Sequence, residues 1–295
     1  MFNPFQLLQK RACVPTGLSL ACLSGLHSLT TLDLSDCNLS EEAIPSDFGC
    51  SLASLEILDL SNNQFIRLLE SIGQLSRLES LHLKGCRKLQ TLPEFRSDVY
   101  VDAHNCISLD TLDNQTGQCD SVLQANCVNC FKMVENDSYK SNAISLLTRY
   151  LKFQRWSSSV GSNQKRFEFI LPGNEIPEWY NHQSVGRVIT LELDPGWFTN
   201  KFMGFTTCVV FRMVKLLPPA VYMLFISMFL KINGASVEHG YVTNFKFGEK
   251  CDQPKLDHIW FYYIHRHTYP YVLCRVAGHL PSACILIWSP LHCAN

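Results

Sequence analysis

The sequence has few charged residues and no excess of either sign. Charged residues make up 17% of the 295 positions, against 46% hydrophobic residues, and the formal net charge is −1. A near-neutral chain has no overall electrostatic attraction for nucleic acid or for an anionic membrane surface. The length is enough for one or two domains with a sizeable core. We therefore expect a globular protein whose partner is neither nucleic acid nor membrane.

Long hydrophobic runs are also missing. The longest, LLPPAVYMLFISMFL at 216–230, is shorter than the roughly 20 residues of a membrane helix, and Pro218 and Pro219 interrupt it. It reads as one or two buried strands. The N-terminus, MFNPFQLLQKRACVP, lacks the basic start and unbroken apolar stretch of a signal peptide. The phosphate-binding motif G-x-x-x-x-G-K-[ST] occurs nowhere in the chain, so no nucleotide switch is assigned to it.

Cysteine is not scarce, but its pattern is not that of a metal or redox site. The fourteen cysteines are spread over a chain of ordinary length, and several fall inside a repeat, which favours buried, reduced thiols. Cys127 and Cys130 form a lone C-x-x-C, without a second pair or nearby histidines for zinc and without a thioredoxin-like context. We predict a packing role for this pair, no metal and no cofactor.

A repeat dominates the first third of the chain. The pattern L-x-x-L-x-L-x-x-(N/C)-x-L recurs, and its Asn/Cys positions, at Cys37, Asn63, Cys86 and Cys106, step by 26, 23 and 20 residues. Such repeats stack so that the leucines of each turn are buried against neighbouring turns. The sequence therefore predicts an α/β leucine-rich-repeat solenoid over residues 26–112, after a degenerate repeat start at 1–25.

The residues between the leucines are expected to point to the concave face, because strand side chains alternate in direction. Concave solenoid faces commonly bind other proteins, although a merely solvated strand face would show the same pattern. Three outward columns follow from the register: Thr31, Ile57, Ser80 and Tyr100; Asp33, Asp59, His82 and Asp102; Ser35, Ser61, Lys84 and His104.

The remainder of the chain is expected to differ from the repeats. Residues 113–162 read as a junction with an amphipathic helix over 138–155, and residues 163–295 as an all-β antiparallel sandwich. Strands are expected at 166–171, 187–193, 203–214, 221–232, 240–247 and 257–264. The short array shows no polar capping unit at its start, so we expect it to be the end of a longer one.

The stretch FILPGNEIPEWYNHQSVG, at 169–186, holds two glutamates and a histidine, which raises the question of an acid/base site. Glu175, Glu178 and His182 have no nucleophile motif beside them and no second histidine at a telling distance. Pro172-Gly173-Asn174 reads as a turn, and Ile176-Pro177 as extended chain anchored by Trp179. We interpret the stretch as a structural corner without catalytic residues.

The same stretch carries a family resemblance. ILPGNEIPEWYNHQSVG, followed by ITLELDPGWFTNKFMGFTTCVVF, resembles the start of the C-terminal jelly-roll/Ig-like (C-JID) domain of plant immune receptors of the Toll/interleukin-receptor-type nucleotide-binding leucine-rich-repeat class. LESLHLKGCRKLQTLPE, VDAHNCISLDTL and NCFKMVEN resemble the last repeats and the junction of that family. The motif positions map to Pro172, Gly173, Glu175, Ile176, Pro177, Trp179, His182, Gly186, Trp197 and Gly204.

The resemblance implies a jelly-roll/Ig-like sandwich and a non-enzymatic recognition module in the cytoplasm or nucleus. Its partner would be a pathogen effector protein, held by the repeat face and the β-domain loops, or another immune receptor chain. No Toll-type domain precedes the repeats, so the family's NAD-cleaving activity is not assigned here. The last 30 or so residues do not resemble the family's closing strand and are expected to be atypical, which suggests a truncated receptor or an incomplete gene model. The alternatives are a carbohydrate-binding or carbohydrate-active jelly roll and an extracellular repeat receptor.

Overall fold

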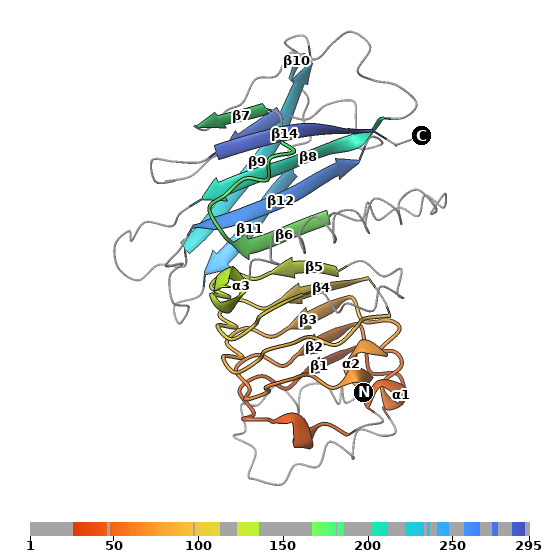
Figure 1. Cartoon of the computed structure of the whole chain (residues 1–295). Helices are drawn as coiled ribbons and strands as arrows, with labels where there is room; N and C mark the ends of the chain where they lie inside the picture. The colour runs from red at the N-terminus through yellow and green to blue at the C-terminus, as the bar shows by residue number, and fades with distance from the viewer. Residues whose placement is uncertain are drawn as a thin grey trace. The chain divides into compact units, whose positions relative to one another are not determined.

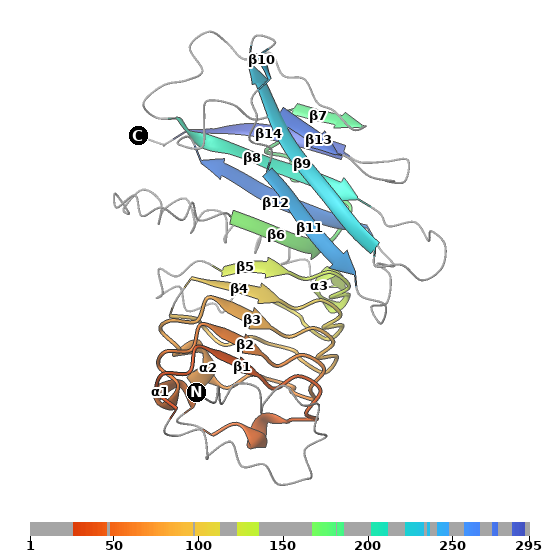
Figure 2. The same cartoon turned by 180° about the vertical axis from the view of Figure 1, so that it is seen from behind.

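The protein divides into two compact units, Met1–Val160 and Gly161–Asn295 (Figures 1 and 2). The computed structural model describes the first unit over 26–45, 48–96, 98–112 and 123–135, and the second over 167–180, 182–185, 202–211, 222–232, 235–236, 241–247, 257–265, 273–276 and 285–292. The predicted helix at 138–155 and the predicted strand at 187–193 lie outside these residues.

The described part of the first unit is a stack of parallel strands, one from each turn of the chain (Figure 1). Each strand pairs with the next along the sequence, in the order β1 (Thr31–Asp33), β2 (Ile57–Asp59), β3 (Ser80–His82), β4 (Val99–Asp102) and β5 (Leu123–Asn126). The predicted leucine-rich-repeat solenoid is confirmed, because the register aligns the central leucine of each repeat. The aligned residues are Leu32, Leu58, Leu81, Val101 and Ala125, each at most 2% exposed.

The return segments of the coils contain only short helical pieces. They are η3 (Glu41–Ala43), α1 (Phe48–Ser51), α2 (Glu70–Gly73) and α3 (Lys132–Glu135). Phe48, Ile72 and Met133 from these pieces are buried with the leucines. Each fully buried apolar side chain stabilises the stack by about 1.5–3 kcal/mol relative to an exposed one. The core is therefore the sum of many similar contributions, repeated turn after turn.

Every coil leaves its strand through one residue in the left-handed backbone region. These residues are Asp36, Asn62, Gly85, Asn105 and Asn129, with φ of 56°, 57°, 70°, 62° and 61°. Asn, Asp and Gly are the residue types that adopt this conformation at least cost. The backbone N–H of each of the first four donates to a carbonyl of the next coil, as in Asn62 to Lys84 at 2.7 Å. The turn thus continues the hydrogen bonding of the strands.

The residue after each left-handed turn satisfies buried backbone carbonyls, as its Asn/Cys pattern predicts. Asn63 Nδ2 donates to the carbonyls of Leu34 (2.9 Å) and Leu60 (2.8 Å), and Asn63 Oδ1 accepts the N–H of Leu39 (2.8 Å). In later coils a thiol takes this place: Cys86 Sγ donates to Leu60 O at 3.2 Å. Further thiol bonds join Cys106 to Leu83 O at 3.1 Å and Cys130 to Ala103 O at 3.1 Å.

The repeat array extends one coil beyond the predicted limit at residue 112. The start of the predicted junction at 113–162 belongs to the array, because β5 pairs in parallel with β4 and places Ala125 and Cys127 in the core. The sequence LQANCVNC at 123–130 aligns with VYVDAHNC at 99–106, so Cys130 follows Cys106 by one repeat. The C-x-x-C is therefore two core positions of a repeat, and both thiols are buried and free.

The second unit contains a sheet of five strands whose pairings are all antiparallel. Its order is β6 (Phe167–Pro172), β12 (His258–His265), β8 (Phe202–Phe211), β14 (Ile285–His292) and β7 (His182–Val185). The predicted strands at 166–171, 203–214 and 257–264 are confirmed within a few residues. Consecutive residues Ile259–Tyr263 are at most 5% exposed, so both faces of the central strand β12 are covered.

A second antiparallel sheet lies behind the first in Figure 1 and in front of it in Figure 2, so this unit has two layers. β9 (Tyr222–Ile232) pairs with β11 (Tyr241–Phe247), with β10 (Ala235–Ser236) and with β13 (Leu273–Val276). The strands predicted at 221–232 and 240–247 are confirmed. Residues 285–292, within the end expected to be atypical in sequence, form β14, which pairs with β8 on one side and β7 on the other.

Candidate functional site

The outward columns predicted from the repeat lie on neighbouring strands in register. Asp33 is beside Asp59, Asp59 beside His82, and His82 beside Asp102. The structure adds a fifth row that the sequence interpretation missed, with Gln124 beside Tyr100 and Asn126 beside Asp102. Alignment of Cys130 with Cys106 could have revealed this row. The predicted residues are therefore brought together on one face of the strand stack.

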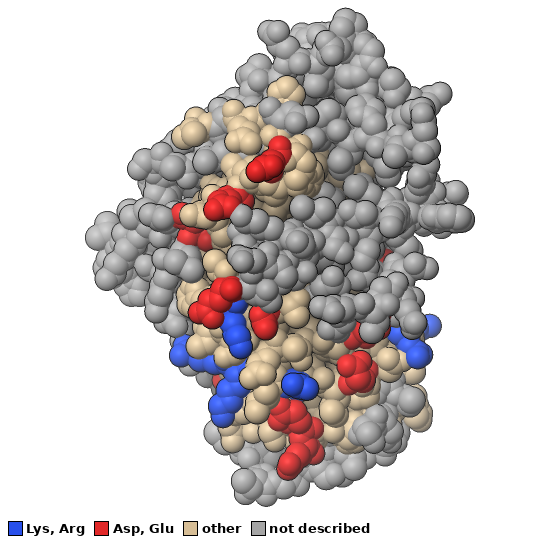
Figure 3. Space-filling model, in the orientation of Figure 1, with Lys and Arg blue, Asp and Glu red and all other residues tan. Residues whose placement is uncertain are grey.

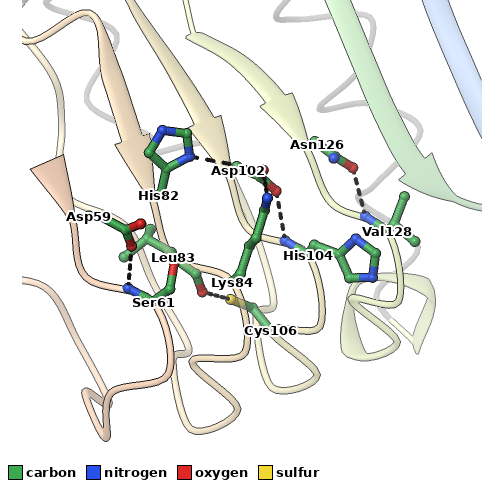
Figure 4. Close-up of polar contacts among 10 residues, drawn as sticks. All are labelled: Asp59, Ser61, His82, Leu83, Lys84, Asp102, His104, Cys106, Asn126 and Val128. Atoms are coloured by element: carbon green, nitrogen blue, oxygen red, sulfur yellow. Dashed lines mark hydrogen bonds and ion pairs between the residues drawn. The ribbon is translucent and has the colours of Figure 1, made fainter. Parts of the chain in front are cut away.

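Four side chains in the second column close the strand ends. The Oδ1 atoms of Asp33 and Asp59 each accept the N–H two residues later, from Ser35 and Ser61, at 2.9 Å. Asp102 does the same for His104 at 3.4 Å, and Asn126 for Val128 at 3.3 Å (Figure 4). This is the local turn that Asp and Asn side chains form with their own backbone. The Oδ1 atoms of this column thus have a structural role. The Oδ2 atom of each aspartate takes no part in the turn.

The third repeat interrupts the column with a histidine and brings a lysine beside it. Lys84 Nζ lies 3.1 Å from Asp102 Oδ2, and His82 Nδ1 lies 4.0 Å from the same oxygen (Figure 4). Asp102 therefore has one oxygen on its own turn and the other on a cation from the adjacent strand. The charge of Asp102 is compensated within the protein.

The exposure of the predicted face is uneven. Ser61, Asp102 and His104 are buried, at 6%, 6% and 2% exposed, so these three positions of the predicted columns are not open to solvent. Asp102 is buried because Lys84 and His82 reach toward its carboxylate. The other predicted face residues are exposed or half-buried: Thr31, Asp33, Ser35, Ile57, Asp59, Ser80, His82, Lys84 and Tyr100.

The stretch at 169–186 forms a corner followed by a short strand. Gly173 has φ of 154°, and its N–H donates to Asp257 O at 2.9 Å. The turn predicted at 172–174 is not found there, because Pro172 ends β6 and the turn of this segment lies at 178–179. Glu175 and Glu178 are both exposed, with no buried carboxylate between them. His182 begins β7 and pairs with Trp288, so it belongs to a sheet edge and not to a polar loop. Gly186 and Trp197 lie outside the described residues.

The anchor of this corner is Tyr180, which the sequence interpretation missed in favour of Trp179. Tyr180 is 1% exposed, and its hydroxyl lies 2.8 Å from Thr206 Oγ1 of β8. Trp179 is only half-buried and stacks on the Tyr180 ring at 4.4 Å. Burial raises the pKa of Tyr180 well above its usual value, because the phenolate would lose its hydration. A neutral, hydrogen-bonded phenol suits a structural role.

Four of the buried cysteines lie in surroundings that favour the neutral thiol. Burial raises the pKa of Cys86 to about 11, and raises those of Cys106, Cys130 and Cys208 well above the ordinary value. Thiolates are the form that binds metals and attacks disulfides, so these thiols are held in their inert form. Among the described residues, no three His, Cys, Asp or Glu side chains are gathered as a metal site requires. No helix of the described segments has the length and apolar character to cross a membrane.

The stack of repeats agrees with what sequence comparisons find. Residues 28–51 and 54–75 match the Leucine Rich Repeat family, and residues 171–272 match the C-JID domain family. The chain therefore carries leucine-rich repeats followed by a C-JID domain. The strand stack and the corner at Pro172–Tyr180 are the structural counterparts of these two matches.

The chain's relatives are plant disease resistance proteins. It is 32% identical over 195 residues to TMV resistance protein N of Nicotiana glutinosa, covering 62% of this chain and 16% of that protein. It is 30% identical over 200 residues to disease resistance-like protein DSC1 of Arabidopsis thaliana (63% and 16%), and 30% over 230 residues to disease resistance protein RPS4B of the same plant (69% and 19%). The chain thus spans less than a fifth of the length of these relatives.

Proposed function

We propose that this chain is a non-enzymatic recognition part of a plant immune receptor, which binds a pathogen effector protein through the strand face of its repeats and the loops of its β unit. The observation that carries the proposal is the row of outward, partly exposed side chains on stacked parallel strands, in a chain related to disease resistance proteins. A stack built from buried leucines positions these side chains rigidly, which lowers the entropy cost of binding.

The unit that follows the repeats is proposed to be a jelly-roll/Ig-like sandwich. Its two antiparallel layers and the C-JID match at 171–272 support this assignment. Catalysis by the glutamates of the corner finds no support, because Glu175 and Glu178 are both exposed, whereas a glycosidase needs its two carboxylates in a cleft. We propose no cofactor for this chain.

We place the protein in the cytoplasm or the nucleus. The described cysteines Cys37, Cys86, Cys106, Cys127, Cys130 and Cys208 are all free thiols. Free thiols fit a reducing compartment better than the extracellular space, where paired cysteines would be usual. The alternative of an extracellular repeat receptor is therefore less well supported.

A matched pair of substitutions tests the binding face. Ser80 points outward from β3 and is half-buried, whereas Ser76 is exposed in the loop before that strand. Ser80→Arg places a long side chain on the face, and Ser76→Arg places the same side chain off it. Individually expressed pathogen effector proteins would be measured against the full chain and both variants by calorimetry or surface plasmon resonance.

An effector that uses the strand face should lose about tenfold or more in affinity with Ser80→Arg, roughly 1.4 kcal/mol, and little with Ser76→Arg. Equal affinity for both variants would remove the strand face from the proposal. Binding of a receptor's nucleotide-binding domain with no effector present would favour the second candidate partner, another immune receptor chain.

A further inference from the structure

The face of the first two repeats has a charge arrangement that the later repeats lack. Asp33 and Asp59 are direct neighbours in the register of β1 and β2. Neighbouring strands are about 4.8 Å apart, and like charges at that separation repel each other. The Oδ1 atom of each carboxylate accepts a backbone N–H of its own turn. Among the described residues, no lysine, arginine or histidine forms an ion pair with either Oδ2. Asp102, by contrast, has Lys84 at 3.1 Å.

The surrounding residues add to this negative region. Glu56 and Glu79 flank the strand starts of β2 and β3, and Asp36 follows β1. Figure 3 shows several acidic side chains on the described surface of the first unit, with basic side chains close to some of them. The nearby cation of the face, Lys84, is already paired. Among the described residues, the printed ion pairs compensate Asp102 and neither Asp33 nor Asp59.

Two further features of the face at β2 bear on binding: an unpaired hydroxyl and an exposed aliphatic side chain. Ser61 lies two residues after Asp59 and is only 6% exposed. Its Oγ has no hydrogen-bond partner among the described residues. A buried hydroxyl without a partner is costly unless a ligand or water completes it. Ile57, between these polar groups in β2, is 39% exposed. The exposed Ile57 side chain offers apolar area for a partner to cover.

We propose that the face formed by Asp33, Ile57, Asp59 and Ser61 binds a basic segment of a partner protein, one that carries an arginine or lysine next to an aliphatic side chain. The cation lies between the Asp33 and Asp59 carboxylates and relieves their repulsion. The aliphatic neighbour packs on Ile57, and a polar group of the segment completes the Ser61 hydroxyl. This inference rests on the proposed function and names the chemistry of the partner.

The test uses the full chain and two synthetic peptides, acetylated and amidated: the basic peptide RLRLRLR and its acidic counterpart ELELELE. The key variant is Asp33→Asn with Asp59→Asn, because asparagine keeps the Oδ1 acceptor that closes each turn and removes only the charge. Glu42→Gln with Glu135→Gln is the matched control, since it removes the same two charges from exposed positions off the face. Affinities would be measured by fluorescence anisotropy at low and high salt.

We expect the wild-type chain to bind the basic peptide and not the acidic one, with affinity falling as salt rises. The Asp33/Asp59 variant should bind it about tenfold more weakly, and the Glu42/Glu135 control should change by less than about twofold. Ile57→Asn and Ser61→Ala should each weaken binding by roughly threefold or more. Equal loss in both double variants would mean attraction to net charge alone and would overturn the proposal, as would preference for the acidic peptide or no binding of either.

A folding measurement keeps the inference independent of binding. If Asp33 and Asp59 repel each other, Asp33→Asn, which keeps the Oδ1 acceptor, should raise the melting temperature at low salt and less at high salt, whereas no rise at low salt would contradict the repulsion. The two proposals also fail separately. An effector blocked by Ser80→Arg but unaffected by the Asp33/Asp59 variant would keep the proposed function and remove this site, while indifference to every face variant would remove both.

Discussion

The two units differ in how their buried strands pair. In the first, each strand pairs in parallel with the strand one repeat later, as Leu32 does with Leu58. In the second, the pairings are antiparallel and reach across the unit: Val185 of β7 pairs with Ile285 of β14, 100 residues later. The first unit is thus a sum of near-identical local contributions, whereas the second depends on a few long-range pairings. A core substitution in the repeats should therefore destabilise mainly its own coil and the neighbouring coils, whereas one in the β unit should destabilise the whole unit.

The largest effect is expected at the centre of the β unit. Trp260→Ala should lower the free energy of unfolding by about 3–5 kcal/mol, because the ring is 1% exposed and its Nε1 donates to Glu168 Oε1 at 2.9 Å. Hydrogen exchange measured by mass spectrometry should show faster exchange in β6, β8 and β12. Trp260→Phe keeps most of the apolar area and should cost less. Equal acceleration in the repeats would show that the two units unfold together, against the comparison above.

A smaller loss of stability is expected when one repeat loses the Asn side chain that bonds its buried backbone groups. Asn63→Ala leaves the carbonyls of Leu34 and Leu60 and the N–H of Leu39 without their amide partner, in a position 1% exposed. We expect about 2–4 kcal/mol, since each buried group left unsatisfied costs about 1–3 kcal/mol. Gln64→Ala, at the exposed neighbour, is the control and should change stability by less than about 0.5 kcal/mol. Chemical denaturation followed by circular dichroism gives both values.

The turn at Gly85 tests how closely the coils stack. Gly85 has φ of 70°, and a Cβ there would lie 2.3 Å from Asn62 Oδ1 of the preceding coil. Gly85→Ala should therefore cost about 1–3 kcal/mol from backbone strain and the clash. Adding Asn62→Gly removes the clash and should restore part of the loss, because glycine tolerates the left-handed conformation of residue 62. No recovery in the double variant would mean that backbone strain alone sets the cost.

The smallest effect on stability near neutral pH is expected from the buried cysteines of the repeats. These thiols should lower the stability of the folded chain at alkaline pH. The pKa of Cys86 is about 11 in the folded chain, against 9.0 for an ordinary thiol. Between these values the unfolded chain releases a proton that the folded chain retains, so stability falls as pH rises, by about 1.4 kcal/mol per pH unit for this thiol. Below pH 9 the group has no effect. Urea titrations from pH 8 to 10.5 should show a shallower decline for Cys86→Ala, and an identical slope would contradict this account.

Sequence reasoning succeeded where the signal is local and periodic. The spacing of leucines and of Cys37, Asn63, Cys86 and Cys106 predicted the strand stack and which side chains face outward. It missed the coil at 123–130, because Ala125 and Cys127 stand where the earlier repeats have leucines, so the segment does not show the leucine pattern. It also chose Trp179 over Tyr180 as the anchor of the corner, since ring size does not reveal which neighbour has a hydroxyl partner on another strand.

The candidate site was predicted as a region and not in its details. Alternation places Asp33, Asp59 and Asp102 on one face, but it does not show that Lys84 neutralises only the last of them. Likewise, the exposure of Ile57 and the burial of Ser61 depend on the side chains of adjacent coils. These are the features on which the proposed basic partner depends.

The sequence by itself determined the repeating coil of the first unit, because the period of its leucines is a property of neighbouring residues and each coil can be buried only against the next. It also determined the corner at Pro172–Gly173, where one residue type restricts the backbone and the next frees it. Only the tertiary structure decided which carboxylates are compensated, that Tyr180 holds the corner against β8, and that residues 285–292 form a strand between β8 and β7. Such pairings join residues far apart in the chain, and no local pattern of side chains encodes which distant partner each will meet.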